Sequence, residues 1–331
     1  MKQRTYTNPV YDGYMADPFV WRHAGVYYAI GTGQAEADGM TYGQSHVIPL
    51  LRSTDLVVWH FVRHALVRPP DELGGQFWAP AVAVHDGRFY MYYSVGHCER
   101  GIMHHLRVAV ADHPDGPYHD TGEPLVVVGD EGFVYDAHPF QDDDGQWYLF
   151  YNRHFWEMDG EARIGEGIVA RRLIGMTQAS ADCVTIVRPH ADWQRGMQVA
   201  RNGQDVDWHT VEGACVLKHN GRYYCLFSGS YWMTEQYGVD YVVSDHVLGP
   251  YGGDITITGP RVLRSVPECV RGPGHNSLVL GPDNATWYIV YHAWNASMRR
   301  RQMWIDPVRW TSDGPRCSGP TWTASPMTTS E

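Results

Sequence analysis

The stretch Asp136–Asn152 (DAHPFQDDDGQWYLFYN) joins a short apolar segment to an aromatic-rich segment through a polar turn that contains glycine. Two strands joined by a turn of this kind are the signature of a β-hairpin. The pattern recurs in four further stretches: Ala16–Gly31 (ADPFVWRHAGVYYAIG), Ala79–Gly96 (APAVAVHDGRFYMYYSVG), Glu212–Gly229 (EGACVLKHNGRYYCLFSG) and His275–Trp294 (HNSLVLGPDNATWYIVYHAW). The repeats predict an all-β protein built from five similar hairpins.

A tyrosine in the second strand marks the same position in each repeat: Tyr28, Tyr90, Tyr148, Tyr224 and Tyr288. These register tyrosines are 58 to 76 residues apart, so one repeat is long enough for a four-stranded propeller blade with its loops. Five such units fill the 331 residues. We therefore expect residues 1–331 to form a single five-bladed β-propeller domain, with an irregular β-sandwich as the alternative.

The composition excludes several classes of protein. Hydrophobic residues make up 44% of the chain and charged residues 19%, which favours a folded domain with a sizeable core. The net charge of −11 argues against a nucleic-acid partner, because such a surface repels phosphate. There is no apolar run of about 18 residues, so no membrane span is expected. The sequence leaves homo-oligomerisation open.

The six cysteines contain no Cys-x-x-Cys pair, which argues against a zinc site. They are scattered along a chain that is too long to need disulfides for stability, so free thiols are expected. The N-terminal residues MKQRTYTNP do not begin an apolar signal core of 7–15 residues. We therefore expect a cytoplasmic protein, or a secreted one if the chain has been trimmed.

Four of the five repeats begin with an ionisable side chain 11 to 13 residues before the register tyrosine: Asp17, Asp136, Glu212 and His275, with Ala79 in the remaining repeat. In a propeller the innermost strands surround one axis, so equivalent positions converge at one mouth of the channel. Three carboxyl groups brought together there would shift one another's pKa values, as happens at functional sites. Taken singly, each residue could instead cap a turn or lie in solvent.

Two carboxyl groups across a small pocket suit glycosidic bond cleavage, in which one protonates the departing oxygen and the other activates water or attacks carbon. The motifs around these residues are Asn8-Pro9…Ala16-Asp17-Pro18, Phe77-Trp78-Ala79-Pro80, Tyr135-Asp136-Ala137-His138-Pro139, Val211-Glu212-Gly213-Ala214 and Gly272-Pro273-Gly274-His275-Asn276-Ser277. In this order, on five repeats, the chain resembles glycoside hydrolase family 43 over its whole length. It departs from the family where Asp136 is followed by Ala-His-Pro rather than directly by proline.

The resemblance implies hydrolysis with inversion of the anomeric configuration. By position, Asp17 would be the general base that activates water and Glu212 the general acid. Asp136 would raise the pKa of the acid and orient it. An inverting site needs the two reacting carboxyl groups about 6.5–9.5 Å apart, which leaves room for the water.

The resemblance also implies further site residues. His275 would lie near the channel axis beneath the sugar, where some relatives hold a structural calcium through water; no cofactor is required for the reaction. Arg301 is the best match for an arginine that contacts substrate, with Arg299 and Arg300 as alternatives. Trp78 and Phe77 would form a wall of the sugar site, and Phe133 is a weaker candidate of the same kind. Core packing is the alternative for these aromatic residues.

The substrate expected from the resemblance is a plant-type oligo- or polysaccharide from which a terminal sugar is removed. The first choice is an α-L-arabinofuranosidase acting on arabinan or arabinoxylan side chains or on 1,5-arabinan from its end. A β-xylosidase or β-galactosidase is the alternative, and the expected lack of a C-terminal β-sandwich leans slightly against the xylosidase. A retaining fructosidase is disfavoured, because Glu268-Cys269 falls outside the repeat register. The alternative that is not an enzyme is a non-catalytic propeller that binds carbohydrate or protein.

Overall fold

The computed structural model describes residues 5–33, 45–126, 132–252 and 259–328, and these residues form an almost pure β structure. The described helices are three single-turn 3₁₀ segments: η2 (Asp71–Leu73), η3 (Cys98–Arg100) and η4 (Asp192–Gln194). In this part of the chain, no helix is long and apolar enough to cross a bilayer. The prediction of an all-β protein is confirmed.

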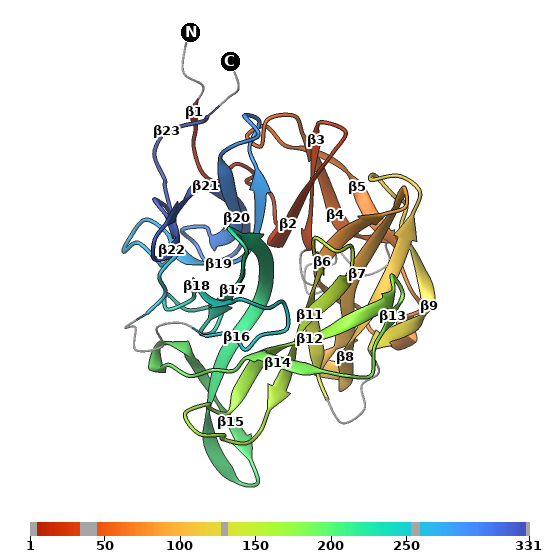
Figure 1. Cartoon of the computed structure of the whole chain (residues 1–331), viewed down its shortest axis with the longest axis vertical. Coiled ribbons are helices and arrows are strands. Elements are labelled where there is room, and N and C mark those ends of the chain that lie inside the picture. The colour runs from red at the N-terminus through yellow and green to blue at the C-terminus, as the bar shows by residue number, and fades with distance from the viewer. Residues whose placement is uncertain (1–4, 34–44, 127–131, 253–258, 329–331) are drawn as a thin grey trace.

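Most strands fall into sheets that follow the order of the chain (Figure 1). The first sheet contains β2 (Ala16–His23), β3 (Val26–Thr32), β4 (His46–Ser53) and β5 (His60–Val67). The second contains β6 (Gln76–His85), β7 (Arg88–His97), β8 (Ile102–Ala111) and β9 (His119–Val126). A further four-stranded sheet near the C-terminus contains β19 (Arg271–Leu280), β20 (Trp287–Trp294), β21 (Arg301–Thr311) and β22 (Gly314–Cys317).

The central part of the chain forms one nine-stranded sheet. Its main path runs through β10 (Val134–Gln141), β11 (Trp147–Phe155), β12 (Gly165–Gly175), β16 (Gln204–His219), β17 (Arg222–Gly229) and β18 (Gly238–Ser244). Three shorter strands pair along it: β13 (Gln178–Ala179), β14 (Val184–Val187) and β15 (Arg195–Arg201). The sheet is continuous because β12 and β16 form a short parallel pair, in which Glu166 lies opposite Thr210.

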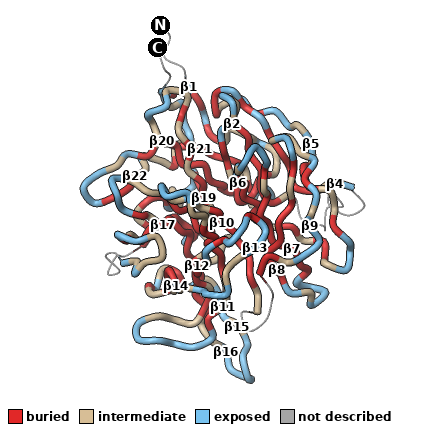
Figure 2. The backbone as a smooth tube through the Cα atoms, turned by 45° about the vertical axis from the view of Figure 1, so that its right-hand side comes forward, coloured by how far each residue is buried: buried red, intermediate tan, exposed pale blue. Residues whose placement is uncertain are grey.

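Each predicted repeat is an antiparallel hairpin: β2–β3, β6–β7, β10–β11, β16–β17 and β19–β20. The first strands of these hairpins pack against one another in a closed ring, in the order β2, β6, β10, β16, β19 and back to β2. Figure 2 shows buried backbone gathered around β6, β10 and β19, with exposed backbone in the outer loops. The ring brings equivalent positions of the five first strands close together.

Every first strand contains a bulge at the same register. At the bulge, one residue has a positive φ between 41° and 65°: Asp17, Ala79, Asp136, Gly213 and His275. Each lies four residues before the partner of the register tyrosine. Glu212 therefore lies one residue before the equivalent position, which Gly213 occupies. The sequence alignment of Glu212 with the other repeat heads was wrong by one residue, because the repeats were counted from the tyrosine without allowing for turns of unequal length.

A bulge leaves one backbone N–H without its partner in the neighbouring strand. At four of the five bulges, a polar side chain of the preceding hairpin accepts a hydrogen bond from this N–H. Thr32 Oγ1 accepts from Ala79 N at 2.8 Å, and Asn152 Oδ1 accepts from Gly213 N at 3.3 Å. Ser228 Oγ and His292 Nδ1 accept in the same way from the bulge residues His275 (2.7 Å) and Asp17 (3.1 Å). Each acceptor follows its register tyrosine by four residues, where the second repeat has Ser94. These bonds anchor four of the five first strands to the hairpin before them in the ring.

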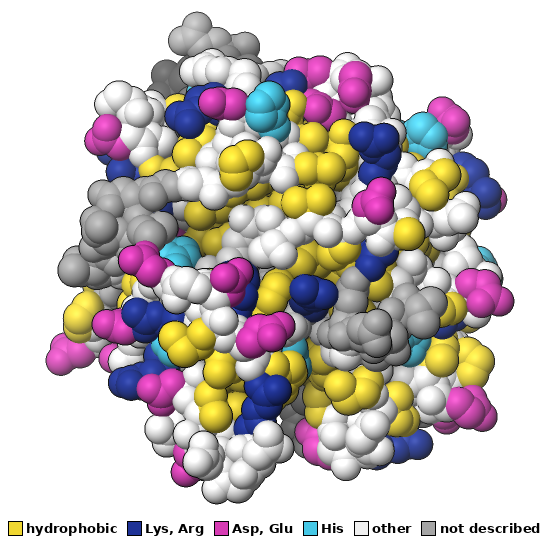
Figure 3. All heavy atoms as spheres, turned by 60° about the horizontal axis from the view of Figure 1, so that its bottom comes forward, with side chains coloured by type: hydrophobic (Ala, Val, Ile, Leu, Met, Phe, Trp, Pro, Cys, Tyr) yellow, Lys and Arg dark blue, Asp and Glu magenta, His cyan; other side chains and the backbone are white. Residues whose placement is uncertain are grey.

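The two ends of the described chain are joined, since β1 (Thr5–Tyr6) pairs with β23 (Ser325–Pro326). Asn8 strengthens this closure: its side chain donates to the Ile305 carbonyl at 2.8 Å and accepts from the Ile305 N–H at 2.9 Å. On the face of the molecule drawn in Figure 3, acidic and basic side chains are interspersed, with hydrophobic side chains between them. That face shows no continuous basic stripe.

Candidate active site

The residues predicted from the sequence come together at one cavity of about 480 Å³. Its lining includes Asp17, Phe77, Trp78, Phe133, Asp136, Glu212, His275 and Arg301. They come from all of the first strands of the ring, from Phe133 just before β10, and from β21. The cavity is therefore formed where the bulges of the first strands meet, as the repeat pattern predicted.

Asp17 is a buried carboxylate surrounded by donors. Its Oδ2 accepts a hydrogen bond from Thr32 Oγ1 at 2.5 Å, and its Oδ1 accepts from Arg301 Nη1 at 3.1 Å. Burial alone would raise its pKa, but the charge of Arg301, together with His275 and His292, holds the pKa of Asp17 well below its usual range. Asp17 is therefore ionised at neutral pH and can accept a proton from water.

Glu212 and Asp136 have the opposite electrostatic environment. Burial, followed by the negative charge of Glu166, raises the pKa of Glu212 to about 8, although Tyr237 donates a hydrogen bond to its Oε1 at 2.7 Å. Burial and the charge of Glu212 raise the pKa of Asp136 well above its usual range, while Gly213 N donates to its Oδ2 at 3.1 Å. The cavity thus holds both an ionised carboxylate and protonated carboxyl groups at neutral pH.

His275 lies between two of these groups. Its Nδ1 is 3.4 Å from Asp17 Oδ1 and 3.8 Å from Asp136 Oδ2. Calcium prefers six to eight oxygen ligands, and no cluster of three or more His, Cys, Asp or Glu arranged to hold a metal is found among the described residues. The protein side chains around His275 therefore do not form a calcium site by themselves, and a calcium held through water stays a prediction.

Of the three consecutive arginines, only Arg301 is buried at the cavity. Its guanidinium lies 4.3 Å from the centre of the Trp232 ring, and its Nη2 donates to the Tyr14 hydroxyl at 3.3 Å. Arg300 instead donates from the exposed surface to the Asp12 carbonyl at 2.8 Å, and Arg299 is exposed. Burial at the cavity thus favours Arg301 over Arg299 and Arg300 as the arginine near the substrate.

Aromatic side chains form another part of the wall. Trp78 is half-buried and stacks on His104, with ring centres 3.6 Å apart, and lies 6.1 Å from the Phe133 ring. Phe77 also lines the cavity but is only 5% exposed and belongs to a core cluster, so packing accounts for most of its surface. Trp78 and Phe133 are both half-buried, so they expose more ring surface for a sugar than Phe77 does.

Glu166 on β12 is a further carboxyl group in the cavity, and the sequence analysis missed it. It belongs to the segment between the third and fourth repeats, outside the repeat register. Burial raises its pKa, and the side chains of Tyr135, Thr210 and Trp208 partly offset this effect. No repeat signal could have found it, because its place depends on the parallel pairing of β12 with β16.

Four polar residues that support the carboxyl groups were also missed. Tyr237 bonds to Glu212, whereas Thr32 and His292 bond to Asp17 and its backbone. Asn152 donates to the Val211 carbonyl at 2.6 Å and accepts from Gly213 N, so it holds the backbone on both sides of Glu212. Thr32, Asn152 and His292 could have been found from the sequence, because each lies four residues after its register tyrosine. Tyr237 has no such position.

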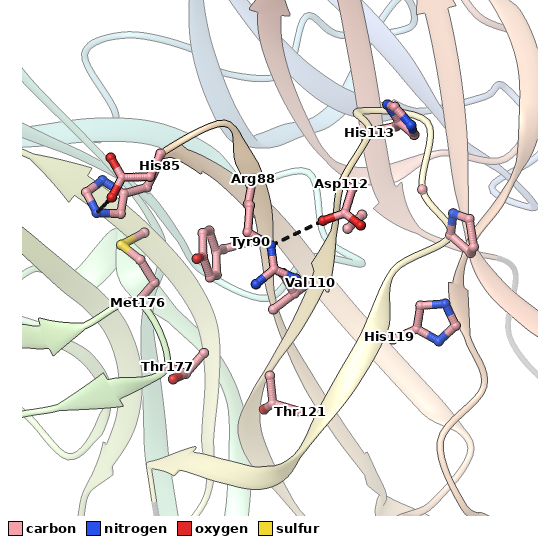
Figure 4. A pocket seen from close by; sticks show the side chains of 14 residues that line it. His85, Arg88, Tyr90, Val110, Asp112, His113, His119, Thr121, Met176 and Thr177 are labelled. Atoms are coloured by element: carbon pink, nitrogen blue, oxygen red, sulfur yellow. Dashed lines mark hydrogen bonds and ion pairs between the residues drawn. The ribbon is translucent and has the colours of Figure 1, made fainter.

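A second hollow, of about 890 Å³, lies outside the ring between β6–β9 and the turn after β12 (Figure 4). Arg88 bonds to Asp112 at 3.2 Å across it, and His85, His113 and His119 lie around its edge. Its acidic groups, Asp86 and Asp112, are largely exposed. The perturbed carboxyl groups lie in the smaller cavity, which is therefore the better candidate for chemistry.

The chain was compared with known proteins. The profile of "Glycosyl hydrolases family 43" matches residues 6–315. A β-D-galactofuranosidase of Aspergillus niger is 29% identical over 86% of this chain and 75% of its own length. An extracellular exo-α-(1→5)-L-arabinofuranosidase of Streptomyces chartreusis is 25% identical over 87% of this chain and 82% of its own. The crystal structure of a thermostable family-43 glycoside hydrolase superposes with a TM-score of 0.83 at 27% identity, covering 99% of this chain and 100% of that one.

Proposed function

Because the chain belongs to glycosyl hydrolase family 43, we propose that it is an inverting glycosidase that removes terminal α-L-arabinofuranosyl groups from plant-type oligo- or polysaccharides. We also propose that its five hairpins head the blades of a five-bladed β-propeller, as the closed ring of first strands supports. The observation that carries the function is the pairing, in one cavity, of an ionised Asp17 with a protonated Glu212.

In this proposal Asp17 accepts a proton from water, which attacks the anomeric carbon. Glu212 donates its proton to the departing glycosidic oxygen as the bond breaks. The charge of Arg301 keeps Asp17 ionised before the step, and burial keeps Glu212 protonated. Each group therefore begins in the protonation state that its role requires.

The choice of sugar rests on the two relatives compared above, of whose length the match covers 75% and 82%: a β-D-galactofuranosidase and an exo-α-(1→5)-L-arabinofuranosidase. A putative β-xylosidase of Xylanibacter ruminicola is 27% identical, but the chain spans only 50% of it. An arabinofuranoside is accordingly the first substrate to test. Galactofuranosides, xylosides and galactopyranosides form the rest of the panel, and faster turnover of one of these would replace the proposed sugar.

The decisive variant is Glu212→Gln, which keeps the shape of the side chain but cannot donate the carboxyl proton. We expect kcat/KM for an alkyl arabinofuranoside to fall by about 10²–10⁴-fold. An arabinofuranoside with a strongly acidic phenol as leaving group should lose far less, because that leaving group needs little protonation. Glu268→Gln, at an exposed position outside the cavity, is the matched control.

Equal losses on the two substrates would remove Glu212 from the acid role. Sugar binding without any turnover by the wild-type protein would favour the non-catalytic reading instead. Proton NMR of the first-formed product tests the stereochemistry: a retained anomeric configuration would contradict the proposed attack by water. Calcium is tested separately, since chelation should lower the melting temperature if the ion is structural and leave it unchanged if none is bound.

A further inference from the structure

Glu166 is placed in the cavity by an arrangement that the other hairpins do not use. On β12 it lies opposite His154 of β11 in an antiparallel pair and opposite Thr210 of β16 in a parallel pair. Thr210 and Glu212 are two residues apart on β16, so their side chains share one face of the strand. His154, Glu166, Thr210 and Glu212 all line the cavity, which puts Glu166 on the same wall as Glu212.

The Glu166 carboxyl group has no strong counter-ion. Among the described residues, no Lys or Arg nitrogen lies within 4.0 Å of it, and the nearest basic group is His154 Nε2 at 3.8 Å. Burial lowers the pKa of His154 to about 4, so the ring is neutral at working pH. The Glu166 side chain is 17% exposed and lines the cavity, where its polar neighbours are the uncharged side chains of Tyr135, Thr210 and Trp208.

Tyr135 provides an independent observation on the same wall. It precedes Asp136 on β10, lines the cavity and is 5% exposed. Among the described residues its buried hydroxyl oxygen has no hydrogen-bond partner within 3.5 Å, although it lies close enough to the Glu166 carboxyl group to lower the pKa of that group. Leaving a buried hydroxyl without a good hydrogen bond costs free energy, and a bound polar group that completes the hydrogen bonding would remove this cost.

We propose that Glu166 and Tyr135 form a polar subsite that binds a hydroxyl group of the sugar on the Glu212 side of the cavity. This inference rests on the proposed glycosidase function. A sugar hydroxyl can donate its one proton to the carboxylate and accept a hydrogen bond from the phenol, so one hydroxyl satisfies both protein groups. The neighbouring Phe133 ring, 5.4 Å from Tyr135, gives the subsite an apolar side suited to a sugar's C–H face.

The charge of Glu166 supports this placement, because it is the first charged neighbour that raises the pKa of Glu212. A sugar hydroxyl bound between the two carboxyl groups would therefore be held next to the proton donor. Glu166 is a substrate-contacting residue in this proposal, and its effect on the acid is secondary. Both effects distinguish it from a residue that only stabilises the fold.

The test combines enzyme variants with substrate analogues. The kcat/KM values of the wild-type protein, Glu166→Gln and Tyr135→Phe are measured on an aryl arabinofuranoside and on its 2-, 3- and 5-deoxy analogues. We expect both variants to lose roughly 10- to 100-fold on the parent sugar. On one analogue, the same for both variants, the loss should nearly vanish, because the contacted hydroxyl is already absent.

Melting temperature and the pH profile provide the structural controls. Glu166→Gln should also move the basic limb of the kcat/KM profile downward by about one pH unit, which a purely structural role would not do. A loss that is equal on every analogue, or no loss at all, would overturn the subsite. If Glu166→Gln does not fold, the wild-type comparison across the analogues and the Tyr135→Phe data still decide it.

Failure of the function gives a different pattern. If the wild-type protein turns over none of the glycoside panel, the proposed activity fails and the subsite is tested by calorimetry with free arabinose and its deoxy forms. The subsite would be supported if both variants bind arabinose more weakly than the wild type but bind one of the deoxy sugars as well as the wild type does. Arabinose binding that is unchanged in both variants, or absent in the wild-type protein, would overturn it.

Discussion

At the scale of single residues, the two reacting carboxyl groups differ in which neighbours they have rather than in how deeply they lie. Asp17 faces the Arg301 guanidinium, while Glu212 faces Glu166. Activity requires ionised Asp17 and protonated Glu212, so kcat/KM should stay high up to about pH 8 and then fall, following the pKa of Glu212. A pH profile of kcat/KM measures this, and a basic limb below pH 6 would contradict the assignment of Glu212.

Thr32 is a further residue whose single hydroxyl serves two partners. It donates to Asp17 and accepts from Ala79 N. Thr32→Val removes both hydrogen bonds, so the pKa of Asp17 should rise and the acidic limb of kcat/KM should move to higher pH. The unpaired Ala79 N–H should lower the free energy of unfolding by about 1–3 kcal/mol.

Thr185→Val, at an exposed position on β14, is the matched control for this change. It should alter neither the pH profile nor the denaturation midpoint measurably. An acidic limb that does not move in Thr32→Val, despite the lost stability, would show that Thr32 supports the strand without acting on Asp17.

At the scale of elements, the parallel pairing of β12 with β16 depends on Gly165. A Cβ there would lie 1.8 Å from the His209 carbonyl oxygen, and the glycine φ of +151° is one that other residues rarely adopt. Gly165→Ala should therefore cost at least about 2 kcal/mol of stability and displace Glu166. Gly175→Ala on the same strand meets no atom within 4 Å and is the control.

The two glycine variants are compared by chemical denaturation and by kcat/KM on the arabinofuranoside. We expect Gly165→Ala to lose both stability and activity, and Gly175→Ala to stay within about 0.5 kcal/mol of the wild type. If Gly165→Ala keeps full activity, the pairing of β12 with β16 does not position a group that matters for turnover.

The kind of strand pairing also explains which elements and site residues could be predicted from the sequence. Hairpins are local, and their alternation and turns are written in adjacent residues, so all five were predicted. Asp17 and Asp136 followed because they lie at equivalent bulges. Glu166 did not, since a pairing between strands from different repeats leaves no periodic mark in the sequence. Tyr237 was missed for the same reason, as it precedes β18 outside the hairpin pattern.

At the scale of the whole molecule, the ring of strands and β12 gather four carboxyl groups with shifted pKa values into one cavity, and this arrangement opposes folding. The pKa of Glu212 is about 8 in the folded protein against an ordinary value of 4.5. Between these two values the folded state holds a proton that the unfolded state has released. The stabilising effect of that proton is complete below pH 4.5 and is lost progressively as the pH rises toward 8.

Glu212→Gln should therefore make the protein more stable than the wild type at high pH, even though it removes activity. The glutamine stays neutral, so the variant lacks the stability loss of about 1.4 kcal/mol per pH unit that a single raised carboxyl group contributes. It also removes the charge that raises the pKa of Asp136.

Unfolding free energies of both proteins from pH 5 to pH 8.5 should diverge as the pH rises. Glu123→Gln, at an exposed position on β9, is the control and should follow the wild type. Parallel curves for Glu212→Gln and the wild type would mean that Glu212 is ionised in the folded protein, which would remove the proton donor from the proposed reaction.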